Sequence, residues 1–269
     1  MRAWSLLQIA AMALAFLWFS RSTIGDRSRL RGCLVLAFPF AGAGAIGLGM
    51  LLRVPAWIRS GFQAAVLVHD ADFMAYGALL GLVIAYALLA RRRGFEPWSA
   101  LDSLAAPLGI LVAVARIGCF VAGCDHGTIT SVPWAVSYPA GSQAFRSHLD
   151  AGLVQASDAR SLPVHPAQLY ESLVGVGMVL AVLALQRRSR RLSRPRAPGA
   201  LFVAAAMTYA IGRFLVEMVR GDDRGMLGPL STPQWLSIAV ALYLAGRALD
   251  AGSSAGARSS GSTGGYPPE

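Results

Sequence analysis

Long apolar runs, separated by short polar segments, make up most of this chain. Seven runs approach the roughly 20 residues that an α-helix needs to cross a hydrocarbon core about 30 Å thick. They cover residues 4–19, 32–52, 73–90, 100–121, 168–186, 200–218 and 233–249. The pattern predicts an all-α polytopic membrane protein with seven transmembrane helices.

The polar segments between the runs alternate in charge. Arginines gather in the first, third and fifth segments, at residues 21–31, 91–93 and 187–196, whereas the other segments hold most of the aspartates. Because cytoplasmic loops carry the excess of basic residues, we expect the N-terminus outside and the C-terminus in the cytoplasm. A basic cluster follows the first run, which is the reverse of a signal peptide, so we interpret this run as an uncleaved helix.

Two segments differ in composition from the apolar runs. Residues 124–163 contain prolines, glycines and Trp134, and we expect them to form a small cap on the exported side. Residues 251–269 are rich in Gly and Ser and have too few apolar side chains to fold, so we predict a disordered cytoplasmic tail. The remainder, residues 1–250, is predicted to be a single transmembrane domain that includes the cap.

Composition narrows the class of protein. Hydrophobic residues make up 55% of the chain and charged residues 14%, which indicates a membrane protein. All 24 basic side chains are arginine, and because they lie mainly between the apolar runs, topology explains the net charge of +10 without nucleic-acid binding. Three cysteines are too few for a disulfide framework, and Cys119 and Cys124 lack CxxC spacing, so neither disulfides nor zinc are indicated.

Polar side chains interrupt the apolar runs at one predicted depth. Arg116 lies near the outer end of the fourth run and opens a segment, residues 116–127, with three glycines, two thiols and an imidazole. Others at the same depth are Tyr76 in the third run, His165, Gln168, Tyr170 and Glu171 at the start of the fifth, and Arg213, Glu217 and Arg220 at the end of the sixth. Ionisable side chains inside a membrane are costly unless they face a partner or a wet cavity, so this convergence indicates a functional site.

The arginines at this depth favour an anionic ligand. Arg213 and Glu217 are four residues apart and can form an ion pair on one helix face. Arg116 has no acidic neighbour within a turn of its own helix and needs Glu171, Glu217 or an anion. A phosphate is suitable because a guanidinium donates to two phosphate oxygens at once. The alternative is that Arg116 only extends its charge to the membrane surface.

The glycines and cysteines of residues 116–127 have less specific interpretations. Gly118, Gly123 and Gly127 allow close approach of a phosphate to backbone amides, or they serve only as packing contacts between helices. Cys119 and Cys124 are five residues apart and diverge if both are helical. In that case they act as small buried apolar side chains.

Several of these segments resemble a known family. Residues 116–127, 165–171, 209–220 and 230–236 are similar in order and spacing to bacterial phosphatidylglycerol:prolipoprotein diacylglyceryl transferase, and the resemblance covers residues 73–237. It implies seven helices in the bacterial inner membrane with the N-terminus outside. It also implies transfer of the diacylglyceryl group of phosphatidylglycerol to the lipobox cysteine thiol of a prolipoprotein signal peptide, with release of glycerol phosphate and no metal or nucleotide cofactor.

The resemblance also implies roles for individual residues. Arg116 and Arg213 would hold the phosphate and stabilise the charge of the leaving group, and Glu217 would orient Arg213. Tyr76 and His165 complete the expected catalytic set. The expected substrate-binding residues are Gly118, Cys119, Gly123, Gly127, Tyr170, Glu171, Glu217 and Arg220.

The chain departs from the family pattern at three positions. Cys119 replaces an asparagine, and Cys124 replaces an acidic residue. Tyr76 replaces the histidine of helix three, and a tyrosine hydroxyl is a poor base at neutral pH, so His165 or His126 is the candidate substitute. Two other functions stay open, namely a lipid-binding or lipid-moving protein without catalysis and a membrane thiol oxidoreductase that uses the two cysteines.

Overall fold

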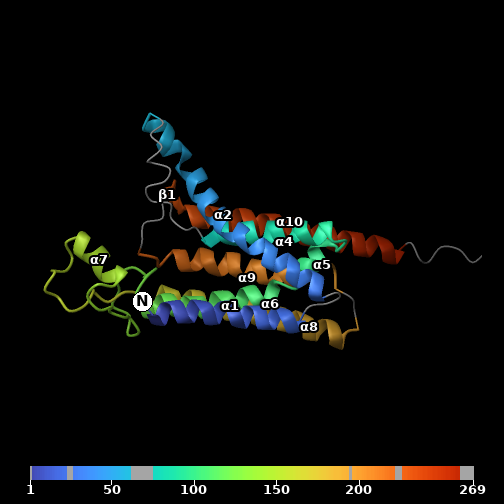
Figure 1. Cartoon of the computed structure of the whole chain (residues 1–269), viewed down its shortest axis with the longest axis horizontal. Coiled ribbons are helices and arrows are strands. Elements are labelled where there is room, and N and C mark those ends of the chain that lie inside the picture. The colour runs from blue at the N-terminus through green and yellow to red at the C-terminus, as the bar shows by residue number, and fades with distance from the viewer. Residues whose placement is uncertain (1, 23–26, 62–74, 194–195, 222–225, 261–269) are drawn as a thin grey trace, which may run out of the picture. The chain divides into compact units, whose positions relative to one another are not determined.

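A computed structural model describes residues 2–22, 27–61, 75–193, 196–221 and 226–260 of this chain. These residues are mainly helical, with one short pair of antiparallel strands (Figure 1). The elements are α1 (Arg2–Ser22), α2 (Arg27–Arg59), α4 (Ala75–Arg92), α5 (Pro97–Asp102), α6 (Ala105–Ala122), α7 (Gln143–Asp150), α8 (Ala167–Arg191), α9 (Ala200–Glu217), β1 (Met226–Leu227), β2 (Leu230–Ser231) and α10 (Thr232–Ser260).

Helix length and composition confirm a polytopic all-α membrane protein. Within the described residues, four helical stretches are long and apolar enough to cross a membrane, namely Ser28–Leu51, Pro97–Ala122, Ala167–Arg191 and Ala200–Glu217. A shorter apolar helix covers Ser5–Arg21. The count of seven spans and the orientation stay predictions.

The fourth apolar run is predicted to form one continuous helix. In the structure it forms two helices, α5 and α6, with a short break between them. The Glu96 side chain caps the start of α5 by accepting a hydrogen bond from the backbone N–H of Trp98, at 3.1 Å. Pro107 has no backbone N–H to donate to the carbonyl of Ser103, so a helix cannot continue through this point with all of its hydrogen bonds. A proline is tolerated in the first turn of α6, where N–H groups have no helical partner.

The chain divides into two compact units, one of residues 1–18 and 105–269 and one of residues 19–104. In the second unit, α2 and α4 pack closely through glycines. A Cβ atom added at Gly77 or Gly81 would overlap the backbone carbonyl of Gly44 or Phe40, respectively. Glycine therefore sets the distance between these two helices.

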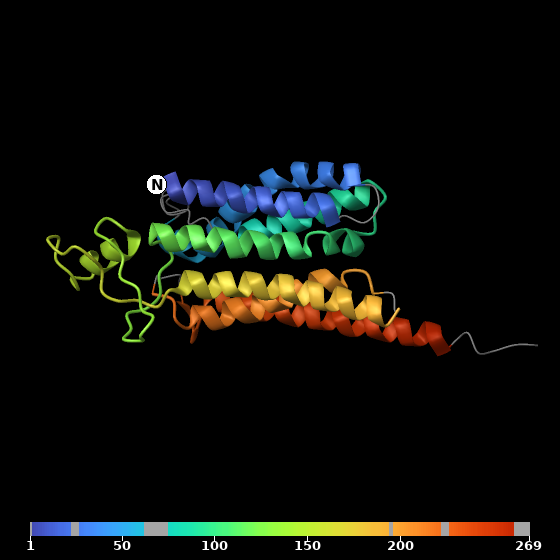
Figure 2. The ribbon, with the colours of Figure 1, turned by 90° about the horizontal axis from the view of Figure 1, so that it is seen from below.

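In the first unit, α6 packs against α8, α8 against α9, and α9 against α10. Gly109 and Gly175 allow the backbones of α6 and α8 to approach, and Ser172 Oγ donates a hydrogen bond of 2.7 Å to the carbonyl of Ala113. These contacts align the ends of the helices that carry the site. Figure 2 shows α6 and α8 running side by side.

The segment between α6 and α8 forms a small cap at one end of these helices (Figures 1 and 2). It contains α7 and isolated strand pairings such as Val136 with Val164. Tyr138, Ala144 and Val164 form its buried apolar cluster. The predicted cap is therefore a folded part of the first unit, and its exported location stays a prediction.

The C-terminal helix is longer than its predicted apolar run. α10 ends at Ser260, so the helix continues into the segment that was expected to be a disordered tail. Residues 261–269 lie outside the described residues, and a domain boundary at residue 250 stays a prediction.

Candidate active site

Glu171, in the second turn of α8, is the centre of a buried ionic network. Its carboxylate is 2.6 Å from Nε of Arg116, 3.2 Å from Nε of Arg213 and 3.7 Å from Nη1 of Arg220. Only 2% of Glu171 is exposed. A buried carboxylate is stable in its charged form only when it is paired, and three guanidinium groups meet that need here.

Asp125, just after α6, closes the network into a ring. Its two carboxylate oxygens lie 2.7 Å from Nη1 of Arg116 and 2.9 Å from Nη2 of Arg220. Its backbone φ is 58°, in the left-handed region that aspartate tolerates better than most residues. With 24% of its side chain exposed, Asp125 is the most accessible of the six charged groups.

The ion pair expected on α9 is confirmed. Arg213 Nη1 pairs with Glu217 four residues later. Glu217 also accepts a hydrogen bond of 2.9 Å from Ser231 Oγ on β2. Arg213 is thus held between Glu171 on one side and Glu217 on the other.

The network balances its own charge, because three arginines face three carboxylates. Arg116, Glu171 and the α9 pair come from three packed helices, while Asp125 and Arg220 come from the segments that follow α6 and α9. Removing one partner of a buried pair costs about 3–5 kcal/mol because the other charge is left uncompensated. The predicted convergence of these arginines with Glu171 and Glu217 is confirmed.

Asp125 is the member of the network that the sequence analysis did not identify. The family pattern has its acidic residue at the position of Cys124, and Asp125 follows directly. Asp125 supplies a carboxylate one position later, where it pairs with Arg116 and Arg220.

The end of α6 explains why the two cysteines meet. Gly123, with φ of 69°, donates its N–H to Phe120 O, and Cys124 donates its N–H to Cys119 O at 3.2 Å. This pair of bonds is a Schellman turn, which brings the side chains at its two ends together. The two thiols were expected to diverge only if both were helical, and this condition is not met because Cys124 lies after the end of α6.

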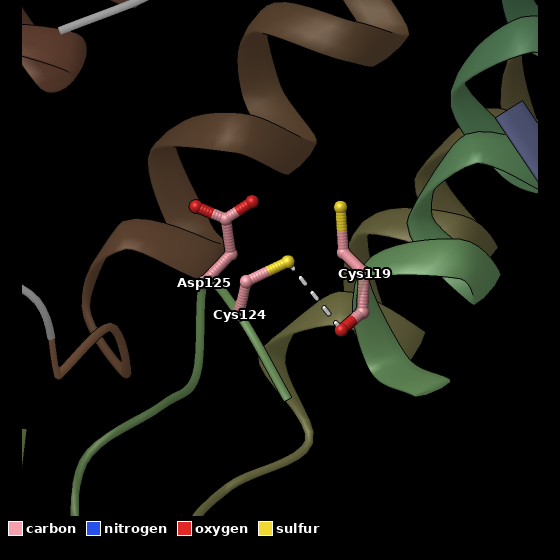
Figure 3. Close-up of side chains that lie close together, drawn as sticks. All are labelled: Cys119, Cys124 and Asp125. Carbon is pink, nitrogen blue, oxygen red and sulfur yellow. Dashed lines mark hydrogen bonds between the residues drawn. The ribbon is translucent and has the colours of Figure 1, made fainter. Parts of the chain in front are cut away.

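Cys119 and Cys124 are free thiols beside Asp125 (Figure 3). Cys124 Sγ donates a weak hydrogen bond of 3.6 Å to the carbonyl of Cys119. Contact with the Cys119 thiol, burial and the neighbouring Asp125 charge all raise the pKa of Cys124. These effects disfavour the thiolate form of Cys124, and a redox nucleophile reacts as the thiolate.

Gln168 fixes the turn that carries Cys124. It is fully buried, and its Nε2 donates a hydrogen bond of 2.6 Å to the carbonyl of Cys124. Its Oε1 accepts a hydrogen bond of 3.3 Å from the hydroxyl of Tyr138. Burial raises the pKa of Tyr138 to about 12, so this hydroxyl keeps its proton. Gln168 is a positioning residue that sequence analysis left without a role.

Gly127 lies where three backbone segments meet. Its N–H donates to His165 O at 3.0 Å, and it pairs with Arg220 as an isolated strand bridge. A Cβ atom here would lie 2.6 Å from the carbonyl oxygen of His165 and 2.7 Å from that of Val219. Backbone therefore occupies the space next to Gly127, as expected if this glycine is a packing contact. Substrate binding by Gly127, by buried Gly118 and by Gly123 stays a prediction.

Of the expected catalytic residues, His165 lies near the network in sequence but contacts a different group. Its Nδ1 is 3.2 Å from the hydroxyl of Tyr170, which also accepts a hydrogen bond of 2.7 Å from Nε1 of Trp134. In the described part of the chain, the ring of His165 contacts Tyr170 rather than an arginine. The catalytic role of His165 and the substrate-binding role of Tyr170 stay predictions.

His126 and Tyr76 are the other candidates for proton transfer. The ring of His126 is buried against that of His148, with centroids 5.7 Å apart, and its Nδ1 bonds the carbonyl of Gly127. A carbonyl only accepts, so Nδ1 carries a proton, and in the neutral ring the lone pair is on Nε2. Tyr76 is buried at the start of α4 in the second unit, and its role at the network stays a prediction.

The fold and the network define a polytopic helical membrane protein with a buried ionic site where α6, α8 and α9 meet. A family model described as prolipoprotein diacylglyceryl transferase matches residues 1–248. The phosphatidylglycerol--prolipoprotein diacylglyceryl transferase of Rhizobium leguminosarum bv. trifolii is 30% identical over 228 residues, which cover 84% of this chain and 73% of the relative. The protein of the same name from Idiomarina loihiensis is 29% identical over 248 residues, covering 88% and 83%. This chain belongs to the prolipoprotein diacylglyceryl transferase family.

Proposed function

We propose that this chain transfers the diacylglyceryl group of phosphatidylglycerol to the thiol of a lipobox cysteine in a prolipoprotein signal peptide. The observation that carries the proposal is the ring of Arg116, Asp125, Arg220 and Glu171, with Arg213 attached to it. Family membership supports the reaction, and the names of the relatives support the two substrates. The ring supplies fixed cations for the phosphate that departs.

The reaction places specific demands on the arginines. The sulfur of the acceptor forms a bond to the glyceryl carbon, the C–O bond to the phosphate breaks, and the thiol proton ends on the departing glycerol phosphate. Negative charge concentrates on the phosphate oxygens as the C–O bond breaks. Arg116 and Arg213 make two ion pairs each, whereas a guanidinium has five N–H donors, so both have the capacity to bind phosphate oxygens.

Asp125 gives the network a way to admit an anion. The six charged groups already sum to zero, so a bound phosphodiester adds a negative charge to a neutral cluster. Asp125 is the most exposed carboxylate, and the phosphate competes with it for Arg116 and Arg220. Glu171 and Glu217 are nearly inaccessible and keep the arginines in place during the exchange.

Proton handling is assigned to His165, with Tyr76 as a hydrogen-bond donor to the phosphate. The hydroxyl of Tyr170 accepts from Trp134, and if it donates to Nδ1 of His165 the imidazole carries its proton on Nε2. The Nε2–H of His165 can then donate a hydrogen bond to the departing phosphate. His126 is the candidate base for the thiol proton, because in the neutral ring its Nε2 holds the lone pair.

The same proposal includes seven membrane spans, an exported N-terminus and a cytoplasmic C-terminus in the bacterial inner membrane. Arginine clusters at residues 91–93 and 187–196 support cytoplasmic ends for α4 and α8. This orientation puts the network and the cap, residues 124–163, on the exported side. The lipobox cysteine of a translocating prolipoprotein reaches the network from that side.

The test is lipidation of a prolipoprotein in cells depleted of their main transferase. Wild-type protein should restore lipidation, and Arg116→Ala and Arg213→Ala should each abolish it at equal protein level. Arg146→Ala is the matched control, because Arg146 is an exposed arginine on α7. Failure of the wild-type protein to restore lipidation would contradict the proposal.

A purified reaction separates catalysis from lipid binding alone. Protein in detergent is given phosphatidylglycerol and a lipobox peptide, and glycerol phosphate and thioether product are measured. The proposal requires both products in equal amounts. Binding of phosphatidylglycerol without release of glycerol phosphate indicates a lipid-binding protein instead.

A further inference from the structure

Cys119, Cys124 and Asp125 form a compact group of metal-binding side chains next to the arginine ring. We call this group the thiol–carboxylate cluster. The two sulfur atoms and one carboxylate oxygen all lie within 4.8 Å of one another, and Figure 3 shows the three side chains side by side. Cys119 is buried, whereas Cys124 and Asp125 are partly exposed.

We propose that the thiol–carboxylate cluster binds a divalent cation of the zinc class and keeps one coordination position open for the acceptor thiol. This inference rests on the proposed transferase function for the identity of the fourth ligand. It does not rest on sequence spacing, which lacks a zinc motif. The Schellman turn after α6 brings together two thiols that their spacing in the sequence does not pair.

The positions of the ligand atoms fit such a cation after a small contraction. In a tetrahedral site with bonds of about 2.3 Å to sulfur and about 2.0–2.2 Å to oxygen, ligand atoms lie about 3.5–3.8 Å apart. The atoms of the cluster lie within 4.8 Å, so each needs to move by only about 1 Å. Three protein ligands with one open position are the arrangement of catalytic zinc sites.

The charges of the surrounding network also fit a cation with two thiolates. Binding of Zn²⁺ releases both thiol protons, so the added charges of the metal and the two sulfurs sum to zero. The arginine network is therefore still neutral. Each carboxylate oxygen has two lone pairs, so an Asp125 oxygen can bind the metal while Arg116 or Arg220 holds it in place.

The cation would replace the proton-removing group that this chain lacks at Tyr76. A thiol that binds Zn²⁺ loses its proton and stays nucleophilic as a thiolate. The acceptor sulfur then forms its bond to the glyceryl carbon while the C–O bond to phosphate breaks. The released thiol proton ends on glycerol phosphate, and the metal is unchanged. Because Asp125 belongs to both groups, the thiolate would lie beside the bound phosphate.

Cobalt titration of the purified, full-length, reduced protein tests the site directly. Added Co²⁺ should give one equivalent bound per chain, with sulfur-to-cobalt charge-transfer bands and the strong visible bands of a tetrahedral site. One equivalent of Zn²⁺ should remove both sets of bands. Cys119→Ser and Cys124→Ser should each lose the charge-transfer intensity, whereas Cys33→Ser, a change at a buried cysteine of α2, should keep it.

Three results would overturn the proposal. The first is no charge-transfer band in the reduced wild-type protein, and the second is an unchanged band in both Cys119→Ser and Cys124→Ser. The third result combines two observations on wild-type protein purified without reductant. Its mass is lower by two hydrogens because Cys119 and Cys124 form a disulfide, and after reduction it binds no Co²⁺. The first and third readings use only wild-type protein, so a variant that fails to fold leaves the test intact.

Activity distinguishes failure of this inference from failure of the proposed function. Chelation should lower thioether formation at least tenfold, and Zn²⁺ should restore it. Undiminished transfer by metal-free protein would retain the transferase and reject the metal. If the cysteines bind cobalt but the protein never converts phosphatidylglycerol, the metal site is supported. The transferase function and the role of the acceptor thiol as fourth ligand are then both rejected.

Discussion

The arginine–carboxylate network and the α2–α4 contact are both buried and tightly packed, but they are built in opposite ways. At the network, Glu171 holds charged side chains that are expensive to bury. Between α2 and α4, Gly77 and Gly81 remove side chains altogether so that the backbones meet. The first region brings charged side chains together, and the second has no side chains between the two backbones at these glycines.

The difference separates function from structure within one membrane protein. Helix contact in a membrane can be made with small residues at little cost, as α2 and α4 do. The buried network is not needed merely to hold the helices together, because apolar residues of similar volume stabilise a protein as well as buried ion pairs do, or better. We therefore expect changes of charge at the network to remove activity as well as stability, and changes of volume between α2 and α4 to lower stability alone.

Glu171→Gln should have the largest effect, because it removes the charge shared by three arginines with almost no change in volume. We expect glycerol phosphate release to fall on the order of 10²-fold or more and stability to fall by about 3–5 kcal/mol. Rates and unfolding midpoints in detergent would measure the two effects. Asp150→Asn, at the end of α7, is the control and should change neither.

Gly81→Ala should lower stability while the folded protein keeps its rate. The new methyl group meets the carbonyl of Phe40, and overpacking of this kind costs about 1–3 kcal/mol. Gly42→Ala on α2 is the matched control, since its Cβ meets nothing within 4 Å. A lower rate per folded molecule in Gly81→Ala would break the separation between the two regions.

Asp125→Asn should have a smaller effect than Glu171→Gln, because Arg116 and Arg220 both keep Glu171. Loss of one partly exposed charge is expected to lower activity by about tenfold, which corresponds to about 1.4 kcal/mol. It should also tighten phosphatidylglycerol binding, because Asp125 no longer competes with the phosphate for the arginines. Initial rates at several lipid concentrations would separate KM from kcat, and an unchanged KM would reject the competition.

The buried imidazoles of His126 and His148 in the cap are polar like the network, and they should give the smallest effect. Burial and the neighbouring His126 lower the pKa of His148. Its contribution to stability is therefore complete above about pH 6.5 and is lost as the pH falls toward its lowered folded-state pKa. His148→Asn can retain an acceptor for the N–H of Leu162 and should make unfolding midpoints less dependent on pH below about 6.5.

Sequence predicted the helices and the ionic contacts better than it predicted the turns. Apolar runs and arginine clusters follow from the membrane itself, and the Arg213–Glu217 pair follows from helical spacing. The break before α6 and the turn after it depend on a few residues, namely Ser103, Pro107 and Gly123. One-residue differences at these turns decide whether Cys124 or Asp125 faces Arg116, and an apolar pattern does not resolve them.

The most direct test of the central claim is the purified reaction run with wild-type protein and with Arg213→Ala at matched folded concentration. The readout is glycerol phosphate released from phosphatidylglycerol in the presence of a lipobox peptide. Our account predicts one glycerol phosphate for each thioether formed by wild-type protein, and a loss on the order of 10²-fold or more in the variant. Equal release by the two proteins would show that the arginine network serves structure and not catalysis.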